Sequence, residues 1–552
     1  MHFKVKLIML ICTFFILQLK LSSQQIPDTL ITKEDVQHAE KIIGIPFTGV
    51  ERDSMLDGLN ELLHNYQVLH KLSPENSTPP ALIFNPIPKD WQPPSAVNSF
   101  KTSGYQATKI PASFDDLAFY SIGELAALLI TRQVTSLELT QFYLKRLKKY
   151  GPILECVITL TEEKALSQAR QADLEIAAGN YRGLLHGIPY GIKDLFATKK
   201  YKTTWGAEPY KDQVIDMDAT VVKKLEAAGA VLVAKLTMGA LAWGDRWYGG
   251  LTRNPWDTSQ GSSGSSAGSA SAVSAGLVPF AIGTETWGSI VSPSTVCGVT
   301  GLRPTFGRVS RYGAMALSWS MDKIGPICRT VEDCAIVFEA IMGPDNLDQS
   351  VYDYPFSYTP EIDLRNLRIG YLQKDFSGDY PFKTNDSLAL AEMRDLGAEL
   401  IPVSLPDIPV SDLAFILNAE AAAAFDELTR SNRDDLLVRQ IKNAWPNVFR
   451  QSRLIPAVEY INANRLRYTL IQAMQGIMKD IDLYLAPSWE GDNLLLTNLT
   501  GHPCVVLPNG FHEGTPTSIT FIGRLFDEGT ILAAARTYQE ATDFHRKHPE
   551  LK

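Results

Sequence analysis

The chain has 552 residues, 45% of them hydrophobic and 20% charged, and a formal net charge of −9. This is the composition of a globular protein with a sizeable core, and the acidic balance without a basic patch argues against a nucleic-acid partner. No run beyond the N-terminus approaches the roughly 18 apolar residues of a membrane-spanning helix. The cysteines after residue 23 are odd in number and form no C-x-x-C pair, so we expect neither a disulfide framework nor a metal site.

The first 23 residues have the pattern of a secretory signal peptide. Lys4 and Lys6 precede an apolar stretch at residues 7–17, and the small residues Ser22 and Ser23 follow. The pattern predicts an exported protein, periplasmic or secreted, with no stable membrane insertion after cleavage. An uncleaved membrane anchor stays open as the alternative, because the apolar stretch is short and a lysine lies near the cleavage point.

Residues 24–110 are predicted to form a helical extension followed by a proline-rich strap. The spacing of apolar residues predicts helix over 31–72, and Thr32 with Asp35 forms a capping box at its start. The many prolines between Pro74 and Pro94 forbid regular structure. We therefore expect a separable N-terminal module.

Residues 111–345 and 481–552 are predicted to form an α/β core, with a variable, mostly helical insertion at 346–480. Capping boxes at Ser121 with Glu124 and at Thr135 with Glu138 open two helices. Helical segments then alternate with short buried strands, which is the α/β pattern. The strands are expected at 231–234, 277–282, 367–371, 398–403, 481–487 and 504–507.

Serines and glycines crowd residues 257–293 and allow three interpretations of a serine hydrolase site. The G-x-S-x-G at 264–268 matches a nucleophile elbow, but the preceding sequence is polar and broken by Pro255 rather than a buried strand. The S-x-x-K from Ser320 to Lys323 lacks the S-D-N and K-T-G motifs that should accompany it. The third interpretation combines three segments, residues 191–196, 264–269 and 283–290, into one site.

These three segments resemble the amidase signature family of serine hydrolases. The resemblance extends over about 121–342 and 482–549. It is specific because further short motifs fall in register, at 187–189, 254–256, 297–298, 301–304, Asp322 and 325–326. It implies a large mixed β-sheet between layers of helices, and a Ser-cisSer-Lys triad that works without a cofactor.

The resemblance assigns a role to each residue of the triad. It places the nucleophile at Ser289, the bridging serine at Ser265 after a cis peptide from Gly264, and the base at Lys193, with Ser266 in support. A lysine at its ordinary pKa of about 10.4 is protonated at neutral pH and must be desolvated to act as a base. The apolar neighbours of Lys193 suit that burial, and a serine hydroxyl can both donate and accept a proton.

The oxyanion hole implied by the resemblance consists of the backbone N–H groups of Thr286, Trp287, Gly288 and Ser289. Trp287 stands where the family tends to have glycine, and we hypothesise that its indole narrows or caps the acyl pocket. Replacing Trp287 with glycine should then change the preference for substrate size.

Other departures from the family pattern are Glu285 for an aspartate, Val291 for an arginine and Ala267 for a glycine. Met238 and Trp319 lie in segments that neighbour the substrate channel in the family, and they are expected to bind substrate. Core packing is the commoner role of such residues.

Histidine catalysis is the remaining competitor. His186 and His502 both lie in turn-like sequence, and neither belongs to an arrangement expected of a Ser-His-Asp set.

We therefore expect an exported serine amidohydrolase that cleaves a carboxamide to a carboxylic acid and an amine or ammonia through an acyl-enzyme on Ser289. The expected partner is a small-molecule amide, with homodimer formation left open. The alternatives are the glutamine-hydrolysing subunit of an amidotransferase complex, an α/β-hydrolase-type esterase, and a binding protein without activity.

Overall fold

The computed structural model describes residues 30–551 except 73, 95–96 and 106–107. The expected signal peptide at 1–23 lies outside these residues. The described residues divide into two compact units, one of residues 30–72 with Phe425–Leu436, and a larger one that runs from Pro74 to Ala424 and from Leu437 onward. The sequence placed this boundary at residue 110, whereas the strap from Pro74 onward belongs to the larger unit.

The smaller unit contains helices α1 (Lys33–Ile43) and α2 (Gly49–His70) and the short α13 (Asp426–Arg430). The capping box of Thr32 and Asp35 is present at the start of α1. The predicted helical stretch 31–72 is two helices rather than one, because Gly44 ends α1 in the left-handed region at φ 72°. Helix α1 buries only Val36 and Glu40 and α2 buries no side chain, whereas Leu428 of α13 is completely buried.

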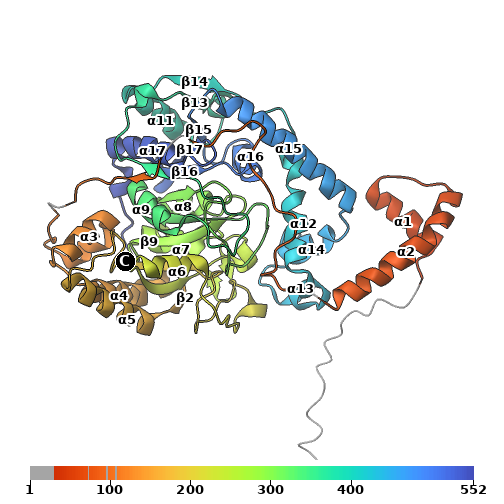
Figure 1. Ribbon diagram of the computed structural model, residues 1–552, viewed down its shortest axis with the longest axis horizontal. Coiled ribbons are helices and arrows are strands. Elements are labelled where there is room, and N and C mark those ends of the chain that lie inside the picture. Colours follow the sequence, from red (N-terminus) through yellow and green to blue (C-terminus); the bar gives the residue numbers. More distant parts are fainter. Residues whose placement is uncertain (1–29, 73, 95–96, 106–107, 552) are drawn as a thin grey trace, which may run out of the picture. The chain divides into compact units, whose positions relative to one another are not determined.

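An eleven-stranded sheet organises the larger unit, so the predicted α/β class with a large mixed sheet is confirmed. In Figure 1 the sheet extends from β14 at the top to β2 at the bottom. In spatial order its strands are β14 (Leu400–Val403), β13 (Ile369–Leu372), β15 (Leu483–Pro487), β17 (Thr515–Gly523), β16 (Cys504–His512), β10 (Thr300–Arg303), β11 (Lys323–Cys328), β9 (Phe280–Glu285), β3 (Pro189–Lys193), β4 (Val231–Leu236) and β2 (Val157–Leu160).

Parallel pairing occurs at two places in this sheet. Strand β3 lies parallel to both β4 and β9, and β13 lies parallel to both β14 and β15. The remaining neighbours are antiparallel. Because β13 and β14 come from residues 346–480, this segment contributes two strands to the sheet and is not a wholly separate helical insertion.

Helices cover the sheet and extend beyond one side of it. Helices α7 and α8 pack together against the central strands, and α9 packs with α6 and α17 (Figure 1). The capping boxes predicted for α3 and α4 are both present. The helices of this unit are α3 (Ile122–Ile130), α4 (Ser136–Leu154), α5 (Glu162–Ala177), α6 (Thr220–Ala227), α7 (Ala267–Ser274), α8 (Val291–Cys297), α9 (Val331–Ile341), α10 (Gln373–Ser377), α11 (Lys383–Asp395), α12 (Phe415–Ala424), α14 (Trp445–Ser452), α15 (Ala457–Met478), α16 (Asn493–Thr500) and α17 (Glu528–Thr542).

The core lies between α4, α5, α7 and the central strands, where small and branched side chains pack without exposure. Such burial is the main stabilising contribution to a fold of this size. The cysteines of the described chain are all buried and free. Among the residues described, no helix combines the length and the hydropathy that crossing a membrane requires.

The proline-rich strap contributes no helix or long strand in its described part, as expected. It is nevertheless attached to the larger unit through Asn76. The side chain of Asn76 donates to the carbonyl of Ala316 at 2.8 Å and accepts from the backbone N–H of the same residue at 2.8 Å. Farther along, Ser99–Phe100 (β1) pairs in parallel with Ser357–Tyr358 (β12).

Candidate active site

Lys193 is the last residue of β3 and its side chain is completely buried. Because β3 and β9 are parallel, their carboxyl ends meet at one edge of the sheet and bring Lys193 beside Thr284. The amine Nζ lies 2.8 Å from Ser265 Oγ, 2.8 Å from Thr284 Oγ1 and 3.1 Å from Ser266 Oγ. Three hydroxyl groups therefore surround one buried amine.

Burial lowers the pKa of Lys193 from its ordinary value of 10.5 to about 7. The negative charges of Asp322 and Glu285 oppose this effect and act to raise the pKa. A substantial fraction of Lys193 is therefore neutral near pH 7. A neutral amine has a lone pair and can accept a proton from a hydroxyl group.

Ser265 and Ser266 lie in the loop that leads into α7. The peptide bond between Gly264 and Ser265 is cis, and a side chain at Gly264 would collide with the carbonyl oxygen of Gly244, only 1.9 Å from the position of its Cβ. The Ser266 hydroxyl donates to the backbone carbonyl of Thr284 and accepts from the backbone N–H of Thr284, both at 3.1 Å. The backbone N–H of Ser266 donates to the carbonyl of Ser289 at 3.2 Å, which brings the two serine-bearing loops together.

The loop from Thr286 to Ser289 follows β9 directly. No hydrogen bond within the described chain occupies the backbone N–H groups of these residues, Trp287 and Gly288 included. Gly288 adopts φ 84°, the left-handed region, so the conformation that requires glycine is at 288 rather than at the position where Trp287 replaces the family's glycine. The arrangement offers consecutive free donors beside Ser289, which is what an oxyanion needs.

Glu285 fixes the position of this loop through buried contacts. Its carboxylate accepts from the backbone N–H groups of Ile290 and Val291 at 2.8 and 2.9 Å, at the start of α8. It also forms a buried ion pair with Arg303 at 2.8 Å and accepts from Asn498 at 2.8 Å. Burial acts to raise the pKa of Glu285, but Arg303 and these donors lower it to about 2, so the carboxylate is ionised.

Asp322 secures the other side of the loop. It accepts from the hydroxyl of Thr286 at 2.5 Å and from the backbone N–H groups of Leu317 and Ser318 at 2.8 and 3.0 Å. Asp322 thus links the loop that carries Trp319 to Thr286, the first residue of the 286–289 loop with its free N–H donors. The site therefore combines a buried amine, three hydroxyl groups in contact with that amine, and a set of backbone N–H donors.

Comparison with known proteins identifies the family of the chain. A family model described as Amidase matches residues 138–493. The chain belongs to the Amidase family. The resemblance to the amidase signature family is thereby confirmed, and the protein is an amide-cleaving hydrolase.

Relatives of this amidase include, by their names, subunits of an amidotransferase and a peptide amidase. The A subunit of glutamyl-tRNA(Gln) amidotransferase from Roseiflexus sp. (strain RS-1) is 36% identical over 470 residues, covering 77% of this chain and 96% of that protein. The structure of native peptide amidase from Stenotrophomonas maltophilia matches with a TM-score of 0.69 and 29% identity, covering 78% and 98% of the two chains. The A subunit from Thermotoga maritima matches with a TM-score of 0.65 and 27% identity, covering 79% and 99%.

A cavity of about 470 Å³ opens beside the site of this amidase, and Thr284 and Thr286 line it. Of the three residues expected to bind substrate, Trp319 lines the cavity. Met238 is completely buried and does not line it. Trp287 is 46% exposed and is likewise absent from the lining, so this cavity gives no support to the idea that its indole narrows the acyl pocket.

The competing residues are placed in structural roles. Ser320 of the S-x-x-K pattern bonds Glu420 and Arg467, whereas Lys323 of that pattern donates to the carbonyl of Met321. His502 bonds Thr500 at 2.8 Å, and burial followed by the charge of Arg303 lowers the pKa of His502 to about 3.

The nearest strand before the G-x-S-x-G loop is β8 (Asp257–Gly261), which is half-buried to exposed, unlike the buried strand of a nucleophile elbow. His186 accepts from the backbone N–H of Arg182 at 3.1 Å, and its ring stacks on Tyr181.

Sequence reasoning did not single out Thr284, nor the anchoring contacts of Glu285 and Asp322. The signal for Thr284 was present, because alternation along a strand places 282, 284 and 286 on one face. The signals for the other two were not local: Glu285 meets Arg303 and Asn498, and Asp322 meets Thr286, only in the folded chain.

Proposed function

We propose that this protein hydrolyses a carboxamide through an acyl-enzyme on Ser289. Lys193 is the base, Ser265 relays the proton, Ser266 and Gly264 hold the relay loop, and the N–H groups of residues 286–289 stabilise the oxyanion. The observation that carries the proposal is the buried amine of Lys193 at 2.8 Å from Ser265 Oγ, since a desolvated lysine is suited to act as a base at neutral pH.

In the first half of the reaction, Ser289 Oγ attacks the carbonyl carbon while its proton passes through Ser265 to Lys193. The C–N bond then breaks, and the proton returns through Ser265 to the nitrogen, which leaves as an amine or ammonia. In the second half, water attacks the ester and its proton passes to Lys193. The bond between the acyl carbon and Ser289 Oγ breaks, the acid leaves, and Ser289 regains a proton.

Labelling with a serine-directed fluorophosphonate tests this assignment. Peptide mapping should find the adduct on Ser289, and the Lys193→Ala variant should label at least about 100-fold more slowly, because the proton acceptor is gone. The Ser266→Ala variant should still label. An adduct on Ser266, or full labelling without Lys193, would overturn the assignment.

A second candidate is the glutamine-hydrolysing subunit of an amidotransferase complex. The names of the curated relatives support this candidate more directly than a stand-alone enzyme. The charged side chains that line the cavity favour an uncharged amide instead, because they already have partners within the protein. Arg311 pairs with Asp348 at 2.9 Å, Asp322 accepts from Thr286, Leu317 and Ser318, and Lys323 donates to the carbonyl of Met321. Free glutamine needs partners for both an ammonium and a carboxylate.

Ammonia release separates the two candidates. The purified chain should release ammonia or amine from apolar carboxamides with a kcat/KM at least about tenfold above that for glutamine. A preference for glutamine, or activity that requires co-purified subunits, would establish the second candidate instead. The test leaves the Ser289 assignment untouched, because both candidates use an acyl-enzyme.

Export of the protein is also a proposal, and it is supported by the sequence of residues 1–23 alone. Fractionation of producing cells, with mass determination of the mature N-terminus, tests it. A full-length N-terminus in the cytoplasmic fraction would contradict it and favour the amidotransferase candidate.

A further inference from the structure

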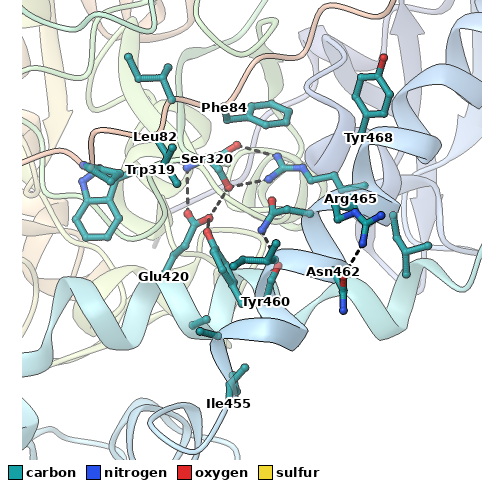
Figure 2. A pocket seen from close by; sticks show the side chains of 18 of the residues that line it. Leu82, Phe84, Trp319, Ser320, Glu420, Ile455, Tyr460, Asn462, Arg465 and Tyr468 are labelled. Carbon is teal, nitrogen blue, oxygen red and sulfur yellow. Dashed lines mark hydrogen bonds between the residues drawn. The ribbon is translucent and has the colours of Figure 1, made fainter. Parts of the chain in front are cut away.

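A second cavity, of about 1320 Å³, lies in the larger unit next to the one already described. Its walls come from three places: the strap, the loop containing Trp319 and Ser320, and helices α12 and α15 (Figure 2). We call it the α15 groove. The strap wall lies outside residues 138–493, the part matched by the family model.

The buried charged groups of the α15 groove, Glu420 and Arg467, both have hydrogen-bond partners within the protein. Glu420 accepts from Ser320 Oγ at 2.7 Å and from the Tyr460 hydroxyl at 2.8 Å. Arg467 donates to the hydroxyl and the carbonyl of Ser320 at 2.7 and 2.9 Å, and its guanidinium lies 3.7 Å from the centre of the Phe84 ring. Figure 2 shows Ser320, Glu420 and Tyr460 pointing toward one another beneath Phe84. These groups do not need a polar ligand.

Apolar side chains make up much of the remaining wall and are open to solvent. Leu82 of the strap is 88% exposed, and Ile461 and Leu466 of α15 are 58% and 53% exposed. Exposed apolar side chains gathered along one hollow mark a binding surface more often than isolated ones do. Covering them with an apolar group removes their surface from water, which favours a hydrocarbon or aryl ligand.

The α15 groove adjoins the cavity beside Lys193. Pro80, Leu82, Ile83 and Trp319 line both cavities, so the two spaces meet at the strap and at the Trp319 indole. Thr284 and Thr286 also line the smaller cavity, and Thr284 contacts Lys193. An amide whose carbonyl lies at the N–H donors of 286–289 can therefore extend past Trp319 into the groove.

We propose that the α15 groove is a subsite for a long apolar arm of the amide substrate, either its acyl chain or the substituent on its nitrogen. This inference rests on the proposed function. The ligand class is an amide with one extended alkyl, aryl-alkyl or apolar peptide arm. The strap supplies one wall and α15 the other.

Two substrate series test the subsite in the full-length protein. One varies a linear acyl chain from two to fourteen carbons on a constant anilide, and the other varies an N-alkyl chain on a constant acetamide. In one series kcat/KM should rise by up to about threefold per added methylene once the chain passes Trp319, because each buried methylene is removed from water. The series that responds identifies the arm.

The variant Ile461→Glu places a charge in the groove and should lower kcat/KM for the longest chain by about tenfold or more, leaving the two-carbon substrate within twofold. Val458→Glu is the matched control, because Val458 lies on the same helix, is 64% exposed and does not line the groove. It should leave both substrates unchanged. Circular dichroism of each variant checks that the fold is retained.

The outcomes separate the subsite from the reaction itself. If no amide of either series is cleaved and Ser289 does not label, the proposed function fails. If short amides are cleaved but both series are flat, or if Ile461→Glu and Val458→Glu behave alike, the subsite is wrong while the function stands. A flat series together with a dimer that Ile461→Glu dissociates would also overturn it, and would make the groove an interface between copies.

Discussion

At the scale of the residue, the site depends on the protonation state of Lys193. A surface lysine is protonated at neutral pH, and an ammonium group has no lone pair with which to accept a proton. Lys193 has no exposure and three neutral hydroxyls around it, so the charged form loses hydration that these partners only partly replace. Its chemistry follows from where the fold puts it and not from its type.

We therefore predict that kcat/KM rises with pH to a plateau. Only neutral Lys193 can accept the proton, and its pKa is lowered to about 7, so activity should be low at pH 5.5 and should rise through about pH 7. Initial rates with a neutral amide between pH 5.5 and 9 measure this. Activity that is flat over the range, or falls across pH 7, would remove Lys193 from the role of base.

Gly288 gives a second prediction at the same scale. A Cβ at Gly288 would lie 3.1 Å from both Leu494 Cδ2 and Ser292 Oγ, and the φ of 84° is strained for any L side chain. Gly288→Ala should lower kcat by about tenfold or more, because the N–H donors shift, and destabilise the fold by about 1–2 kcal/mol.

Gly514→Ala is the control for Gly288→Ala. Gly514 has φ 82° with nothing within 4 Å of its Cβ position, and it lies in the hairpin between β16 and β17. It should lose similar stability in urea unfolding while kcat stays unchanged. Equal losses of kcat in the two variants would show that Gly288 matters only for stability.

At the scale of the element, the site is built where parallel strands end and helices begin. β3 supplies Lys193, β9 leads into the free-donor loop, and α7 and α8 start after the two serine loops. Glu285 joins these elements, since it ends β9, caps the first N–H groups of α8 and pairs with Arg303 of β10. The Glu285 carboxylate therefore links β9, α8 and β10.

Glu285→Gln should destabilise the larger unit by about 3–5 kcal/mol, because it leaves Arg303 charged and unpaired in a buried site. Urea unfolding at pH 7 measures the loss. Asp363→Asn, which breaks the exposed pair with Arg365, is the control and should cost less than about 1 kcal/mol.

The pH dependence of the Glu285 contribution follows from its lowered pKa. The stabilisation is complete above the unfolded pKa of about 4.3 and is lost as pH falls through the folded value of about 2. The difference in stability between wild type and Glu285→Gln should therefore narrow in acid. A difference that stays constant from pH 7 to pH 2.5 would contradict this account.

At the scale of the whole molecule, catalysis is assigned to the larger unit, which holds the complete sheet and every residue of the site. The two helices α1 and α2 bury little of their own surface, so they add little to the stability of that unit. The strap differs from them, because Asn76 bonds Ala316 and Leu82 lines both cavities.

A chain that begins at Pro74 should therefore keep its activity on a short amide within about twofold and its melting temperature within about 3 °C. A chain that begins at Pro88 lacks the strap wall and should melt lower and lose the response to chain length. Calorimetry and rate measurements on the two truncations check this. Equal behaviour of both would mean that the strap is not part of the site.

The sequence alone determined the family, the α/β class and the starts of several helices, because these are written in local patterns. Capping boxes such as Ser121 with Glu124 need only residues three apart, and the serine loops lie within one short stretch of chain. The strand expected at 277–282 is instead Phe280–Glu285, since small apolar residues mark a buried segment but not its register.

Only the tertiary structure decided which groups meet. Lys193 and Ser265 are 72 residues apart, and Glu285 and Asn498 are 213 apart, so no local pattern records their contacts. The same holds for the α15 groove, whose walls at Leu82 and Ile461 come from segments far apart in the chain. Burial and parallel strand pairing bring such residues together, and both are properties of the folded chain as a whole.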